Sequence, residues 1–158
     1  MITPTLRNPQ GFCLENLNIP NKIHYIVQKQ DWETLDQEFQ QLTSPRGLLY
    51  QTLLKYICFK SIEFMISIRD SSNEWEEDGI WHDDGSRILA FSLSLTLEHE
   101  KIEGGYLGIR KKGEQNFVKI STPPFGTMIV FLTGIHGYEH KIHQVTKGRR
   151  IVIAGWCT

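Results

Sequence analysis

The sequence predicts a mainly β protein with helices towards its N-terminus, and a change of pattern along the chain leads to that fold class. Before about residue 60, apolar side chains recur at the spacing of amphipathic helices. From Ile62 onwards, short runs of β-type residues alternate with turns rich in glycine, proline and aspartate. Short strands at this spacing are typical of a sandwich, jelly roll or barrel, with the helices covering one side.

Two helices are expected, both between residues 31 and 60. The first covers Asp31–Thr43, with Asp31 as the expected N-cap. The second starts at Ser44-Pro45, with proline in its first turn, and ends near Lys60. The residues before Asp31 are expected to form a loosely ordered leader.

The strands expected after the helices are short. They are Glu63–Arg69, Ile80–Asp84, Arg87–Thr96, Gly105–Arg110, Phe117–Ser121, Thr127–Leu132, His140–Val145 and Arg150–Cys157. We expect one domain over residues 1–158, with a helical support in residues 1–61 and a jelly-roll core in residues 62–158.

The composition argues against several classes of function. With 17 basic and 18 acidic residues, the net charge of −1 gives no surplus for binding nucleic acid or anionic lipid. No apolar run approaches the roughly 20 residues of a membrane helix, and the first residues lack signal-peptide features. The three cysteines form no metal-binding pair and are expected to be thiols in a reducing, cytoplasmic compartment. The sequence does not indicate an oligomeric state.

His82-Asp83-Asp84 is the first candidate site. Side chains two apart on a strand point to the same face, so His82 and Asp84 can converge while Asp83 faces away. An imidazole and a carboxylate are two of the three ligands in the facial triad of ferrous oxygenases. One such pair is also expected by chance, so the motif alone is a weak signal.

The second candidate is the segment Glu139–Trp156, read as two strands around a turn at Thr146-Lys147-Gly148. A hairpin would bring His140 and Arg150 into one pocket, as a third metal ligand and a guanidinium that can bind a carboxylate through two parallel hydrogen bonds. The alternative is an exposed turn whose basic residues keep the hairpin soluble.

Together these segments resemble the 2-oxoglutarate/Fe(II)-dependent dioxygenases, particularly their prolyl-hydroxylase-like branch. That family has a His-x-Asp motif, a later histidine and an arginine ten residues after it, as His82, Asp84, His140 and Arg150 are arranged here. The resemblance covers about residues 62–158. Its further matches are Ile142, Val145, Gly148, Pro124–Phe131 and Gly104–Leu107.

The resemblance implies a double-stranded β-helix, which is a jelly roll, and an enzyme that hydroxylates its substrate. His82, Asp84 and His140 would hold Fe(II), and Arg150 would bind the distal carboxylate of 2-oxoglutarate, which leaves as succinate and carbon dioxide. Many members have a tyrosine where Ser94 stands here, so Ser94 is the expected second contact to the cosubstrate. Ascorbate is a further candidate cofactor.

The remaining candidates have less specific signals. His143 is expected on the opposite strand face from His140, His136 in a loop, and Trp81 and Trp156 in packing roles. The acidic loop around Trp75, from Glu74 to Asp78, would border the site and repel nucleic acid, which favours a protein or small polar substrate. The alternative function is a non-redox, cupin-like jelly roll that binds a metal or a ligand.

Overall fold

The computed structural model describes Leu6, residues 10–73 and residues 79–158 of the chain. The α-helices are α1 (Asn21–Gln28), α2 (Trp32–Leu42) and α3 (Leu48–Leu53). The strands are β1 (Phe12–Asn16), β2 (Ile62–Arg69), β3 (Leu89–Ser94), β4 (Glu103–Gly104), β5 (Leu107–Lys111), β6 (Val118–Ile120), β7 (Thr127–Leu132), β8 (Tyr138–Ile142), β9 (Val145–Lys147) and β10 (Arg150–Cys157). Two short 3-10 helices are η2 (His99–Lys101) and η3 (Gly134–His136).

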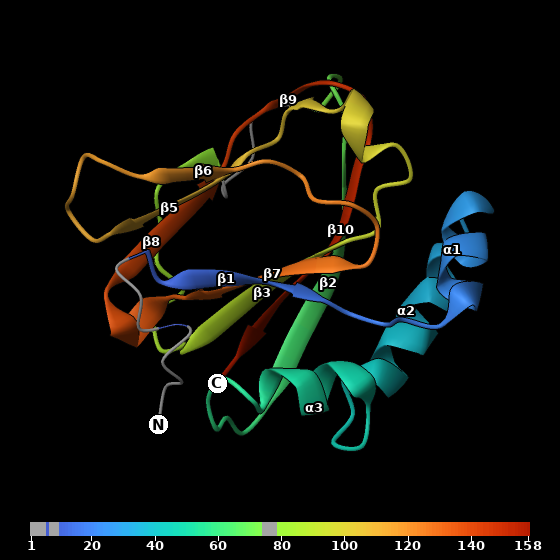
Figure 1. Cartoon of the computed structure of the whole chain (residues 1–158), viewed down its shortest axis with the longest axis horizontal. Helices are drawn as coiled ribbons and strands as arrows, with labels where there is room; N and C mark the ends of the chain where they lie inside the picture. Colours follow the sequence, from blue (N-terminus) through green and yellow to red (C-terminus); the bar gives the residue numbers. More distant parts are fainter. Residues whose placement is uncertain (1–5, 7–9, 74–78) are drawn as a thin grey trace.

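The strands form two antiparallel layers that face each other as a jelly roll (Figure 1). The larger layer is a five-stranded sheet of order β1-β7-β3-β10-β2. The opposite layer contains the three-stranded sheet β6-β5-β8 and the two-stranded sheet β4-β9. This mainly β architecture with N-terminal helices confirms the predicted fold class.

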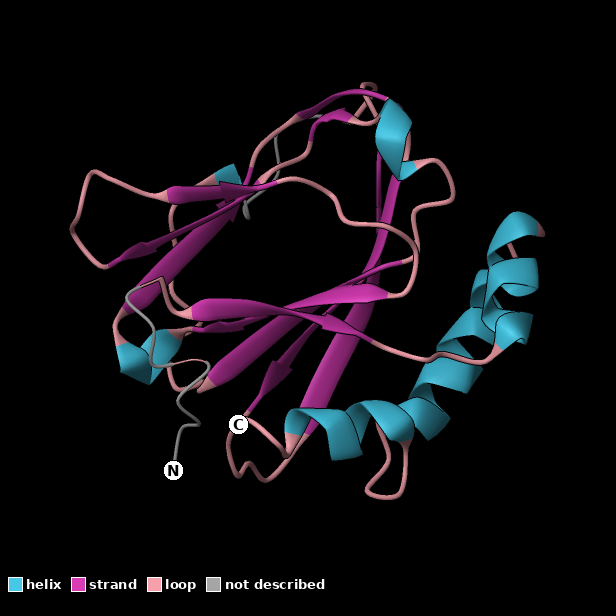
Figure 2. Cartoon of the chain, in the orientation of Figure 1, coloured by secondary structure: helices cyan, strands magenta, loops and turns pink. Residues whose placement is uncertain are grey.

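The helices lie together along one side of the five-stranded sheet (Figure 2). The predicted N-cap is confirmed, because the Asp31 carboxylate accepts hydrogen bonds from the Thr34 N–H at 3.1 Å and the Thr34 hydroxyl at 2.7 Å. The buried Phe39 of α2 packs near Phe64 of β2, with ring centroids 6.2 Å apart. None of the helices in the described residues is long and apolar enough to cross a membrane.

Two predictions for the first sixty residues are wrong. The expected leader contains α1 and β1, and every residue of β1 pairs with β7. The predicted second helix is reduced to α3, because its last part joins the C-terminus instead. The N–H groups of Lys60 and Ser61 both donate to the Thr158 carbonyl. These pairings are long-range in sequence, so a local pattern does not reveal them.

Two predictions around the candidate site are also wrong. The expected strand Ile80–Asp84 is reduced to an isolated antiparallel bridge between His82 and His140. The expected hairpin does not form, because β8 and β10 belong to different sheets. Between them, β9 pairs with β4, so the chain crosses from one layer to the other instead of turning back on itself.

Gly155 of β10 is required by close packing between neighbouring strands. A Cβ atom there would lie 2.2 Å from Cζ of Phe91 and 2.7 Å from the Glu63 carbonyl oxygen. We expect Gly155→Ala to lower the free energy of unfolding by about 1–3 kcal/mol, the usual effect of overpacking, as measured by urea denaturation. The double variant with Phe91→Leu should recover part of that loss, and an unchanged stability of the single variant would contradict this packing argument.

Candidate metal centre

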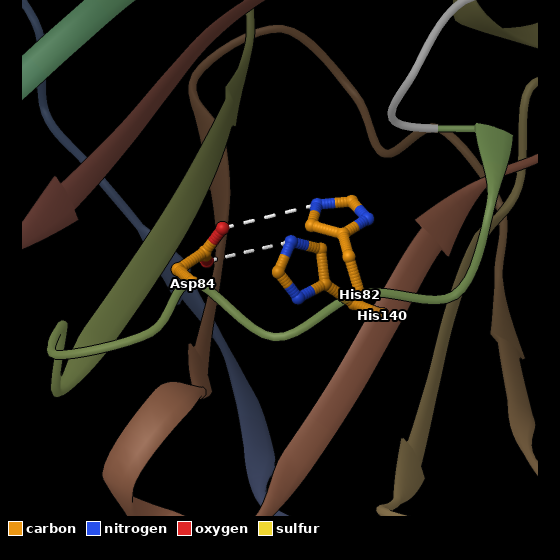
Figure 3. Close-up of side chains that lie close together, drawn as sticks. All are labelled: His82, Asp84 and His140. Carbon is orange, nitrogen blue, oxygen red and sulfur yellow. Dashed lines mark ion pairs between the residues drawn. The ribbon is translucent and has the colours of Figure 1, made fainter.

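The side chains of His82, Asp84 and His140 converge on one point (Figure 3). Nε2 of His82 lies 3.8 Å from Oδ1 of Asp84, and Nε2 of His140 lies 3.5 Å from Oδ2. One candidate ligand atom from each residue lies within 4.8 Å of the others. Two imidazole nitrogens and a carboxylate form the donor set of the facial sites that bind ferrous iron, so the residues present fit that ion.

Main-chain pairing sets the spacing of the two imidazoles. The N–H of His82 donates to the His140 carbonyl at 3.1 Å, and the N–H of His140 donates to the His82 carbonyl at 2.9 Å. Nδ1 of His82 lies 2.8 Å from the Ile80 carbonyl oxygen. Because a carbonyl can only accept, this contact favours the neutral tautomer with its proton on Nδ1, which leaves the lone pair of Nε2 for the cluster.

Asp84 lies in the loop that follows this bridge, and its side chain is only 6% exposed. The hydroxyl of Thr133, the residue after β7, donates to Oδ2 of Asp84 at 3.0 Å. Burial raises the pKa of Asp84, and the hydrogen bond from Thr133 acts in the opposite direction. The neighbouring Asp83 faces away, as predicted, and its hydrogen bond with Lys112 at 2.7 Å lowers its pKa.

One cavity connects the two histidines with Arg150. It has an empty volume of about 460 Å³, part of which is open to solvent. Arg150 is 3% exposed and occupies the first position of β10. The other lining residues are mostly apolar or small: Ser67, Ala90, Phe91, Ser92, Leu107, Phe131, Ile142, Val152, Ala154, Gly155 and Trp156. The structure therefore places Arg150 on the same cavity as His82 and His140, although the expected hairpin is missing and Asp84 is not among the lining residues.

Ser94 is fully buried, and its hydroxyl oxygen accepts a hydrogen bond from the Thr96 N–H at 3.4 Å. It is not among the residues that line this cavity, so its contact with the cosubstrate stays a prediction. Ser92, two residues earlier on β3, does line it. Ser92 was not predicted, although strand alternation places it on the same face as Ser94.

Trp156 packs against the hydrophobic core, as predicted, and it also lines the cavity. The guanidinium of Arg87 lies over its ring, 4.5 Å from the centroid, and pairs with Glu63 at 3.0 Å. The sequence already indicated this position, because Trp156 lies six positions after Arg150 on the same expected strand. Side chains an even number of positions apart on a strand point to the same face.

The other two histidines of this region lie outside the cluster, as predicted. His143 stacks on Phe117, and its Nδ1 lies 3.1 Å from the Tyr106 carbonyl. His136 ends η3, and burial lowers its pKa. The acidic segment from Glu74 to Asp78, including Trp75, lies outside the described residues.

The sequence matches the family model of the 2OG-Fe(II) oxygenase superfamily over residues 70–158, more than half of the chain. No curated protein sequence matches it. Solved structures with the same fold include a prolyl-4-hydroxylase from Pseudomonas putida, at TM-score 0.62 and 15% identity, with 94% of this chain and 88% of that chain covered.

Two further structures share the fold. One is a prolyl hydroxylase from Trichoplax adhaerens in complex with a peptide fragment of the hypoxia inducible factor oxygen degradation domain, at TM-score 0.59 and 15% identity, covering 97% of this chain and 86% of that chain. The other is NvfI, an iron and alpha-ketoglutarate-dependent endoperoxidase, at TM-score 0.61 and 8% identity, covering 95% and 79%. With the family match and the His-Asp-His cluster, the chain belongs to the 2OG-Fe(II) oxygenase superfamily and is a 2-oxoglutarate-dependent Fe(II) dioxygenase.

Proposed function

We propose that this dioxygenase binds Fe(II) through His82, Asp84 and His140 and hydroxylates a protein or small polar substrate. The proposal rests on the observation that His82, His140 and Arg150 line the same cavity. The carboxylate of Asp84 would neutralise part of the charge of a divalent ion, and Nε2 of His82 presents its lone pair to the same point.

Arg150 is the proposed partner of the distal carboxylate of 2-oxoglutarate. Its planar guanidinium can donate two parallel hydrogen bonds to one carboxylate, and its low exposure makes that charge pair stronger than one at the surface. Leu107, Ile142 and Val152 would surround the methylene groups of the cosubstrate. With Fe(II) bound at this site, O2 would be the oxidant and 2-oxoglutarate would supply two electrons, so that one oxygen atom ends in succinate, formed with loss of carbon dioxide, and the other in the hydroxylated product. Ascorbate is proposed as the reductant that keeps the iron ferrous.

An anaerobic titration of the metal-free protein tests both halves of the site. Fe(II) should bind first, and 2-oxoglutarate added afterwards should produce a metal-to-ligand charge-transfer absorption band. Bound iron without a band would contradict the cosubstrate site, whereas failure to bind iron would contradict the metal centre.

The substrate class rests on different support. The Trichoplax adhaerens neighbour was solved with a peptide bound, which favours a polypeptide here. We expect pools of peptides or polar metabolites, supplied with iron and 2-oxoglutarate, to raise succinate formation above the uncoupled background. The Asp84→Ala variant should show no rise with the same pools. Stimulation by single-stranded DNA or RNA, but by no peptide or metabolite pool, would overturn this assignment.

A further inference from the structure

The position of Asp84 needs an explanation, because no regular strand runs through it. Only His82 is bridged to the neighbouring strand, and the glycine after Asp84 has a positive φ of 63°. Strand alternation therefore does not direct this carboxylate towards the two imidazoles. Another part of the chain has to hold it there.

Thr133 makes two hydrogen bonds to Asp84. Its hydroxyl donates to Oδ2 of the carboxylate at 3.0 Å and accepts from the main-chain N–H of the same residue at 3.3 Å. Thr133 has no exposed surface, and it follows directly after β7, which is paired on both sides, with β1 and with β3. One rigidly placed hydroxyl thus contacts both the backbone and the side chain of Asp84, so it restricts the path of the loop and the side-chain rotamer together.

The next two residues hold the same loop through the backbone. A Cβ atom on Gly134 would lie 2.2 Å from the Arg87 carbonyl oxygen and 2.4 Å from that of Gly85, so only glycine allows this close approach. The N–H of Ile135 donates to the Arg87 carbonyl at 3.3 Å. The segment from Thr133 to Ile135 therefore packs against the loop from Asp84 to Arg87 and holds it in place.

We propose that Thr133 is a positioning residue of the metal centre, whose hydroxyl holds the Asp84 carboxylate towards both imidazoles before any metal binds. This inference rests on the proposed role of Asp84 as a ligand. Hydrogen bonds to ligating side chains orient them, and losing such a bond commonly weakens metal binding about 10- to 100-fold. Without the hydroxyl, Asp84 would keep its side-chain hydrogen bond with Trp156 but lose the two contacts that fix the loop and the carboxylate together.

The experiment compares Thr133→Val, Thr133→Ser and Thr122→Val. Valine keeps the shape of threonine but removes the hydroxyl, and serine keeps the hydroxyl. Thr122 is the matched control, since it is 8% exposed and its hydroxyl has no hydrogen-bond partner within the described part of the chain. The dissociation constant for Co(II), as a stable probe for the ferrous site, would be measured by calorimetry, and thermal unfolding of each metal-free variant would be followed separately.

We expect Thr133→Val to bind Co(II) about 10- to 100-fold more weakly, while Thr133→Ser and Thr122→Val stay close to the wild type. Wild-type affinity in Thr133→Val, or an equal loss in Thr133→Ser, would overturn the inference. Should the valine variant not fold, Thr133→Ala replaces it with the same expectation. If neither folds, Thr133 is a structural residue and the inference is overturned.

The outcome is separable from that of the proposed function. If Asp84→Ala loses Co(II) binding but Thr133→Val does not, Asp84 remains a ligand and only the positioning role fails. If the wild-type protein itself does not bind Co(II) or Fe(II), the proposed metal centre fails.

Discussion

His140→Ala is expected to abolish tight binding of iron, and His82→Ala and Asp84→Ala are expected to do the same. The three side chains meet within 4.8 Å, and removing one leaves two ligands, too few for a facial site. Iron content after anaerobic loading and desalting, together with a dissociation constant for each variant, would measure the effect.

His143→Ala and His136→Ala are the matched controls for this result. Both replace a histidine near the site, but His143 stacks on Phe117 and His136 lies on η3, so neither contributes to the cluster. We expect both variants to bind iron as the wild type does. Retained iron in His140→Ala, with loss in His143→Ala, would show that the wrong histidine was assigned.

Arg150→Lys is expected to weaken the binding of 2-oxoglutarate about 10- to 100-fold while iron stays bound. Lysine keeps the positive charge but loses the paired donors of the guanidinium, and one charge-assisted hydrogen bond contributes about 1.5–3 kcal/mol. The charge-transfer band would be titrated with 2-oxoglutarate in both proteins to obtain the two affinities.

Arg149→Lys is the control for that substitution. Arg149 is the preceding residue, but it is exposed and donates to Gln30 at 3.0 Å instead of lining the cavity. We expect its affinity for 2-oxoglutarate to equal that of the wild type. A loss in Arg149→Lys without one in Arg150→Lys would mean that the register of β10 has been misread.

The residues that converge could be predicted because the resemblance to the 2-oxoglutarate/Fe(II)-dependent dioxygenases singled them out. The pair His82 and Asp84 alone was a weak signal, and the order of His82, Asp84 and His140, with Arg150 ten residues after His140, made the pattern specific. These side chains do not converge through strand alternation or through a hairpin. His82 and Asp84 do not share a regular strand, and His140 and Arg150 come from different sheets instead of one hairpin.

What could not be predicted depends on contacts between distant segments. Thr133 and Gly134 lie about fifty residues from Asp84, and a threonine followed by a glycine has no special local pattern. Likewise, β1 is a strand because it pairs with β7, more than a hundred residues later. Periodicity identifies which face of an element is buried, but it does not say which segment will be its partner.

The cavity lies between two layers that contribute different parts of it. His140 lies on β8 of the three-stranded sheet, with His82 bridged to it, whereas Arg150 lies on β10 of the five-stranded sheet. Under the proposed assignment, metal and cosubstrate together would connect the layers from one side to the other. Thr133, which follows β7 of the same five-stranded sheet, already holds Asp84. The link through Arg150 would therefore be a second connection between the layers, made when 2-oxoglutarate binds and lost when succinate departs.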